Sequence, residues 1–173
     1  GEVEIISNKS CSNVLRDNTF RACSGALTLR HGNDCRVEGN YFLGDNKAGS
    51  DGVRVMGERH QIVRNYFTGL TGREGGVISL TAGKHSKGLD GYAPVRSCLI
   101  ASNALVDNTG PCVKLDAGYK SKRKTNVLPE DVIIENNVFL WRTAPLMQGE
   151  APGVHWGDNI VVGPDADRSA LES

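Results

Sequence analysis

An asparagine that recurs along this 173-residue chain constrains its fold more than any other feature. Each time, an apolar residue lies three positions before the asparagine and another lies two positions after it. The intervals are 22, 25, 38, 34 and 22 residues, and the six positions are Asn18, Asn40, Asn65, Asn103, Asn137 and Asn159. Recurrence at such a period is typical of a solenoid, in which each repeat packs on its neighbours.

Each repeat also contains a second short apolar run that begins at or near a glycine or proline, at 25–29, 52–55, 76–80 and 111–115. None of these runs has a helical period. Two or three strands per turn of about 22 residues predict an all-β parallel β-helix, with successive coils about 4.8 Å apart. The repeated asparagine should occupy one corner of every coil and bond to its equivalent in the next coil.

We therefore predict a β-helix domain of about six coils over residues 1–163, followed by a polar tail at 164–173. Two repeats contain extra residues, at 83–96 and 118–129, which should emerge as loops rich in basic residues. The chain begins without methionine and enters an apolar alternation at once. We therefore expect it to be the interior of a longer protein, and we expect the N-terminal coils to be missing from this sequence.

The overall charge excludes some partners. Twenty basic residues balance twenty acidic ones, so no general attraction to nucleic acid or to a membrane surface is expected. No run of 18 apolar residues is present, so a membrane span is not expected either. Five cysteines form no zinc-binding pattern, and we expect small buried residues at Cys11, Cys23, Cys35, Cys98 and Cys112.

Alternation within the strands indicates which side chains face outward. Val3 and Ile5 are expected to point into the core, which leaves Glu2 and Glu4 on the outer face. The same alternation places three basic residues on that face, at Arg30, Arg54 and Lys114. Acidic residues at one end and basic residues along the axis predict a groove for an extended polyanion.

These residue types also allow a reaction. Glu2 and Glu4 offer hard oxygen ligands suited to calcium. Lys9, in the turn after them, could act as a base, and Arg30 could clamp a carboxylate. A uronic acid polymer would use all of these groups, because removal of its C5 proton breaks the 4-O-glycosidic bond by β-elimination.

The strings at 2–10, 25–32 and 51–57 resemble polysaccharide lyase family 6, which includes alginate lyases and chondroitinase B. The resemblance implies a right-handed parallel β-helix, with Lys9 as the Brønsted base and Arg30 as the Brønsted acid. It implies calcium bound by Glu2 and Glu4, where the ion would neutralise the substrate carboxylate. Family members have a third calcium ligand, an asparagine, in a preceding coil that this sequence lacks. The residues expected to contact the sugar chain are His31, Arg54, Lys114 and Tyr119.

The expected function is calcium-assisted cleavage of an acidic polysaccharide by a secreted or periplasmic bacterial enzyme. Alginate is the preferred substrate because most of the family acts on it. The alternatives are a lyase for chondroitin or dermatan sulfate, a non-catalytic β-helix that binds acidic polysaccharide, and an inactive fragment. Another chain is expected to cover the exposed N-terminal end of the solenoid.

Overall fold

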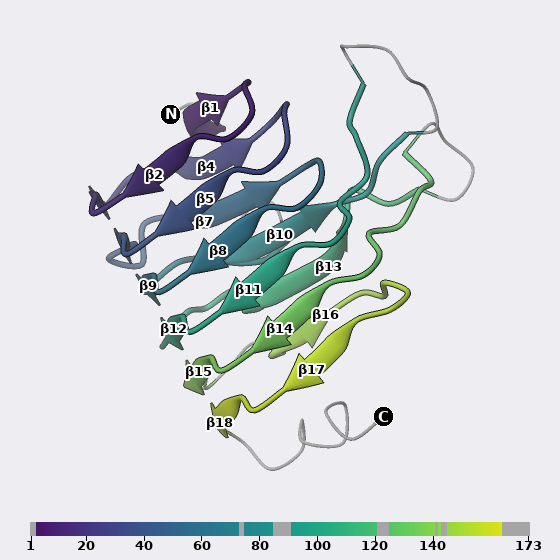
Figure 1. Ribbon diagram of the computed structural model, residues 1–173. Helices are drawn as coiled ribbons and strands as arrows, with labels where there is room; N and C mark the ends of the chain where they lie inside the picture. The colour runs from purple at the N-terminus through teal and green to yellow at the C-terminus, as the bar shows by residue number, and fades with distance from the viewer. Residues whose placement is uncertain are drawn as a thin grey trace.

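The chain forms a parallel β-helix, as predicted (Figure 1). The computed structural model describes residues 3–72, 75–84, 91–120, 125–140, 142 and 145–163. Within these ranges there are eighteen short strands, six in each of three parallel sheets, and no helix long and apolar enough to cross a membrane. The predicted tail at 164–173 lies outside the described residues, and so does Glu2.

Each sheet contains one strand from every coil, so a strand pairs only with its equivalents in the coils before and after. The first sheet contains β1 (Glu4–Asn8), β4 (Gly25–Leu29), β7 (Ser50–Val55), β10 (Ile78–Thr81), β13 (Val113–Ala117) and β16 (Met147–Gln148). The second sheet contains β2 (Val14–Arg16), β5 (Arg36–Glu38), β8 (Gln61–Val63), β11 (Leu99–Ala101), β14 (Ile133–Glu135) and β17 (His155–Gly157). The third sheet contains β3 (Thr19–Arg21), β6 (Tyr41–Leu43), β9 (Tyr66–Thr68), β12 (Ala104–Val106), β15 (Val138–Leu140) and β18 (Ile160–Val162).

The recurrent asparagines form a continuous ladder at the corner between the second and third sheets, which confirms their predicted role. The side-chain amide of Asn40 donates to Oδ1 of Asn65 at 2.9 Å, and Asn65 donates to Asn103 at 3.0 Å. The residue before each asparagine has a positive φ that turns the chain, at Asp17, Gly39, Arg64, Ser102, Asn136 and Asp158. The asparagine side chains therefore form hydrogen bonds with backbone N–H and C=O groups at the bend, which have no partner within either sheet.

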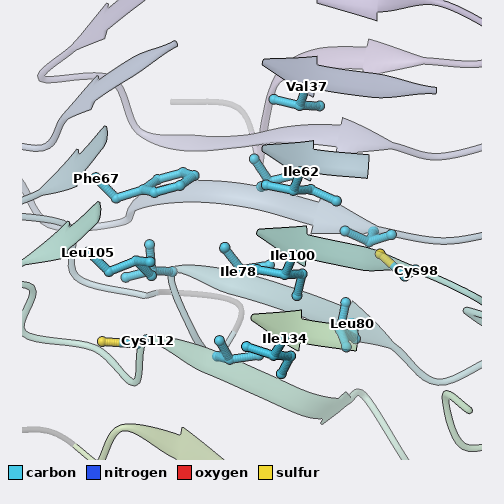
Figure 2. Packing of buried hydrophobic residues seen from close by; sticks show 14 of the residues in the cluster. Val37, Ile62, Phe67, Ile78, Leu80, Cys98, Ile100, Leu105, Cys112 and Ile134 are labelled. Atoms are coloured by element: carbon cyan, nitrogen blue, oxygen red, sulfur yellow. The ribbon is translucent and has the colours of Figure 1, made fainter. Parts of the chain in front are cut away.

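Rows of identical or similar apolar side chains fill the core. Figure 2 shows Val37, Ile62, Ile100 and Ile134 one above another, all contributed by the second sheet. In the third sheet, Phe42 stacks on Phe67 with ring centroids 4.8 Å apart. Such stacking between coils follows from the uniform register, because equivalent residues face each other at the spacing of paired strands.

β1 contains a β-bulge, so the predicted inward and outward directions of its side chains were partly wrong. The register shifts between Glu4 and Ile6, and it is Ile6 that packs against the core. Val3, predicted to point inward, is 37 % exposed. Simple alternation failed at Ile6 because one extra residue in a bulge moves every following side chain to the other face.

The five cysteines are all free, and three of them are buried as expected. Cys35, Cys98 and Cys112 lie in the core, whereas Cys11 is exposed and Cys23 is partly exposed. Burial disfavours the thiolate form of Cys98 and Cys112. It raises the pKa of Cys98 to about 12, and that of Cys112 also to about 12.

Both long repeats leave the β-helix at one corner, between the first and second sheets (Figure 1). The first insertion joins β10 to β11, and the second joins β13 to β14. Their bases are tied together, because Gly83 and Val127 exchange two backbone hydrogen bonds of 2.8 and 3.2 Å. The described bases of the insertions thus lie at the corner where the first sheet ends.

Candidate active site

The outer face of the first sheet presents polar side chains in register. Thr28 of β4 pairs with Ser7 of β1 on one side and with Arg54 of β7 on the other. The row continues from Arg54 to Ser79 and then to Lys114. Arg54 and Lys114 are half-buried between fully inward apolar neighbours, which confirms that both project outward.

Arg30 and Glu4 are bonded across neighbouring coils. Nη1 of Arg30 donates a hydrogen bond of 2.8 Å to Oε1 of Glu4. This bond is the main reason that the pKa of Arg30 is raised. Partial burial alone would raise the pKa of Glu4, but hydrogen bonds from Ser7 and Arg30 outweigh it and lower that pKa. The pair is therefore fully ionised at neutral pH.

The backbone places Lys9 beside Arg30. The carbonyl of Asn8, at the end of β1, accepts the N–H groups of Arg30 at 2.9 Å and of His31 at 3.2 Å. Lys9 is the next residue and its side chain is exposed, whereas His31 is half-buried. Lys9, Arg30 and His31 thus lie at the adjacent C-terminal ends of β1 and β4, and the side chain of Arg30 reaches back to Glu4 at the start of β1.

Gly32 makes this close approach possible. Its φ is +91°, and a Cβ atom there would lie 2.5 Å from the backbone carbon of Ser10. Only glycine tolerates both the positive φ and the missing space. The Arg30-His31-Gly32 segment is consequently held directly against the turn that carries Lys9.

Tyr92 is a residue of the site that the sequence did not reveal. It lies at the base of the first insertion, and its ring centroid is 5.5 Å from the guanidinium carbon of Arg30 and 5.8 Å from that of Arg54. Nζ of Lys84 is 5.1 Å from the same centroid. The insertion has no apolar period, so its position just before Pro94, where the chain returns to the β-helix, was the only available signal.

Lys114 and Tyr119 lie apart from this cluster. Lys114 forms an ion pair with Asp116, with 2.7 Å between Nζ and Oδ1. Tyr119 is 38 % exposed on the turn after β13, where its N–H bonds to the carbonyl of Asp116. No contact in the described part of the chain links either residue to Tyr92 or Arg30, so their predicted role in sugar binding stays a prediction.

Calcium was expected at Glu2 and Glu4. The carboxylate of Glu4 suits a hard cation, and its lowered pKa keeps it charged. However, Arg30 is bonded to Oε1, and the described residues contain no group of three or more side chains able to hold a metal ion. Since Glu2 lies outside the described residues, calcium binding by Glu2 and Glu4 stays a prediction.

The arrangement combines three chemical capacities. A lysine amine stands free at the surface, two guanidinium groups can each clamp a carboxylate, and an aromatic ring lies between them. A base beside carboxylate-binding cations is what removal of a proton next to a carboxylate requires.

Comparisons with known proteins show which family this chain resembles. The family model described as Chondroitinase B matches residues 1–162. Among solved structures, the PL6 family alginate lyase AlyGC is 33 % identical with a TM-score of 0.82, over 93 % of this chain and 22 % of that one. A mannuronic acid specific polysaccharide family 6 lyase from human gut microbiota is 26 % identical with a TM-score of 0.79, over 100 % of this chain and 39 % of that one.

A PL6 alginate lyase in complex with a trisaccharide shares the fold, at 23 % identity and a TM-score of 0.78, over 99 % of this chain and 42 % of that one. This chain therefore spans less than half the length of the solved structures described here. No curated protein sequence matches it.

Proposed function

Since this chain belongs to the Chondroitinase B family of polysaccharide lyases, we propose that it carries the catalytic residues of a lyase that cleaves a polymer of uronic acids. The observation that carries the proposal is the junction of β1 and β4, where one carbonyl binds the backbone of Arg30 and His31 next to Lys9. From this junction the side chain of Arg30 reaches Glu4 at the start of β1.

The proposed reaction is a β-elimination. Lys9 removes the proton from C5 of the sugar. The released electron pair forms a double bond between C4 and C5 as the C4–O4 bond breaks, and the leaving oxygen takes a proton from Arg30, in the role that the family resemblance implies. The bond to Glu4 raises the pKa of Arg30, which opposes release of that proton.

Binding would depend on the other cations. Arg54 would hold a sugar carboxylate through its planar fork, and His31 would contact the ring next to Lys9. Lys114 and Tyr119 are proposed as more distant contacts along the same sheet. Calcium, if Glu2 and Glu4 hold it, would neutralise the carboxylate next to C5 and so acidify the C5 proton.

Alginate is the proposed substrate. The support comes from the relatives: AlyGC is described as an alginate lyase, and the gut enzyme as specific for mannuronic acid. The family model carries the name of a chondroitinase, which favours dermatan or chondroitin sulfate as the second candidate. Action outside the cytoplasm and a second chain against the N-terminal end both remain predictions.

The test is to incubate the protein with alginate or dermatan sulfate, with and without calcium, and to follow the ultraviolet absorbance of the unsaturated product. Lys9→Ala should abolish product formation without changing the far-ultraviolet circular dichroism. Lys47→Ala, at an exposed lysine on a different corner, should leave the rate unchanged. Turnover retained by Lys9→Ala would refute Lys9 as the base, and binding without product would favour the non-catalytic alternative.

A further inference from the structure

Three cations surround one aromatic ring, and two of the four residues come from the first insertion. Lys84 and Tyr92 stand on the two arms of that loop, and the N–H of Lys84 donates to the carbonyl of Tyr92 at 2.8 Å. Arg30 and Arg54 reach the same ring from the first sheet. The ring therefore joins the insertion to the sheet.

The base of the insertion is firmly held. Gly83 is bonded to Val127 of the second insertion, and a Cβ atom on Gly83 would lie 2.3 Å from the nitrogen of Pro94. The N–H of Gly57, which follows β7, donates to the carbonyl of Ala93 at 3.3 Å. The backbone thus fixes Lys84 and Tyr92 at the edge of the sheet before any ligand is bound.

Lys84 is the cation of this cluster whose charge is not compensated. Arg30 is bonded to Glu4, and Arg54 donates from Nε to Oγ1 of Thr81 at 3.4 Å and makes a further interaction. In the described ranges no carboxylate lies within ion-pair distance of Lys84. The ring attracts each cation through its quadrupole, but the cations repel one another, so an anion beside Lys84 would be stabilised.

We propose that Lys84, Arg54 and Tyr92 form a subsite for the carboxylate of the uronate ring next to the one at Lys9 and Arg30, with Tyr92 as its positioning residue. This inference rests on the proposed function. Arg54 supplies the planar fork and Lys84 a compact charge, while the tyrosine ring holds both at a fixed spacing. The insertion thereby determines how the chain is recognised one sugar away from the reaction.

The first experiment measures binding in the inactive Lys9→Ala protein, by calorimetry with uronate oligosaccharides of one, two and three rings. Lys84→Gln should weaken binding of the two- and three-ring ligands about tenfold, as expected for loss of a charge-assisted contact, and should leave the single ring unaffected. Tyr92→Leu should weaken it at least as much, whereas Tyr92→Phe should weaken it much less, because it keeps the ring and removes only the hydroxyl that interacts with Arg30. Lys47→Gln is the matched control and should change nothing.

The second experiment measures turnover in the protein that keeps Lys9. Lys84→Gln should raise KM about tenfold with a much smaller effect on kcat, because the lost contact is remote from the reacting atoms. Thermal unfolding of each variant shows whether the fold is retained. If Tyr92→Leu fails to fold, Lys84→Gln alone decides the question.

The outcomes separate the two proposals. Normal binding of the longer ligands by Lys84→Gln would overturn the subsite, and so would a loss in Tyr92→Phe equal to that in Tyr92→Leu. If uronate is bound in a Lys84-dependent way but never cleaved, the subsite stands and the lyase proposal fails. If cleavage depends on Lys9 but KM is indifferent to Lys84, the lyase proposal stands and the subsite fails.

Discussion

Arg30 of one coil donates a 2.8 Å hydrogen bond to Glu4 of the coil before it, and the side chains are only 31 % and 19 % exposed. Glu4→Gln should lower the free energy of unfolding by about 1 kcal/mol or less, because a partly solvated ion pair contributes little. The measurement is urea-induced unfolding at neutral pH. A loss several times larger would show that the pair is shielded from water far more than its exposure indicates.

The same pair gives the stability a pH dependence. The folded protein lowers the pKa of Glu4, so its contribution is fully present above the ordinary carboxyl value near 4.5 and is lost as the pH falls through the lowered value. Unfolding of the wild type and of Glu4→Gln should therefore converge in free energy at acid pH. A constant difference between them down to pH 3 would contradict this account.

Asn103 is an interior member of the asparagine ladder. Its amide donates to the carbonyl of Ile62 at 2.8 Å and to Oδ1 of Asn137 at 3.0 Å, and its Oδ1 accepts from Asn65. Asn103→Ala should cost about 3 kcal/mol, because buried partners on both sides lose their bonds. Asn18→Ala, at an exposed position of the same ladder, should cost about 1 kcal/mol or less. Equal losses in chemical unfolding would refute the expectation that a buried member of the ladder contributes more stability than an exposed one.

His60 is fully buried and should sense mild acid. Its Nδ1 accepts the N–H of Cys35 at 3.1 Å, so Nε2 carries the proton and bonds to the carbonyl of Met56 at 2.9 Å. Burial lowers its pKa, so below about pH 6.5 the unfolded chain takes up a proton before the folded chain does. The free energy of unfolding should fall by at most about 1.4 kcal/mol per pH unit until the folded value is reached.

The measurement is urea-induced unfolding between pH 7.5 and pH 5. His155→Gln, at an exposed histidine, should keep the slope, whereas His60→Gln should remove most of it. A slope that survives in His60→Gln would assign it to other groups.

The buried thiols should be inert in the folded protein. Burial raises the pKa of Cys98 and of Cys112 to about 12, so almost none of either is a thiolate at neutral pH. A thiol reagent should label exposed Cys11 quickly and should reach Cys98 and Cys112 only on unfolding. Mass spectrometry of the labelled peptides checks this, and labelling of Cys98 in the native protein would point to local opening.

The repeat could be predicted from the sequence because the ladder demands one residue type at one position. The intervals between successive asparagines from Asn18 to Asn159 differ because two repeats contain insertions. The apolar residues nevertheless keep the same positions relative to each asparagine. The outward direction of Arg54 and Lys114 followed from alternation alone. These features are local, so a pattern of nearest neighbours suffices to find them.

The remaining details depend on contacts that leave no such pattern. The bulge before Ile6 adds one residue without any glycine to mark it. Tyr92 contacts Arg30 from the base of an irregular insertion, and the pairing of Lys114 with Asp116 depends on rotamers. Alternation predicted that Arg30 and Lys114 face outward, but not which partner each one finds.

The asparagine ladder has a consequence for how such a molecule can change. The bonds from Asn65 to Asn103 span 38 residues, and those from Asn40 to Asn65 span 25, with nearly the same lengths of 3.0 and 2.9 Å. The frame is thus indifferent to what is inserted between its strands. On the proposed function, a loop such as 83–96 could change in length while the ladder keeps the coils of Lys9 and Arg30 in place, so the reaction and the choice of sugar chain could evolve separately.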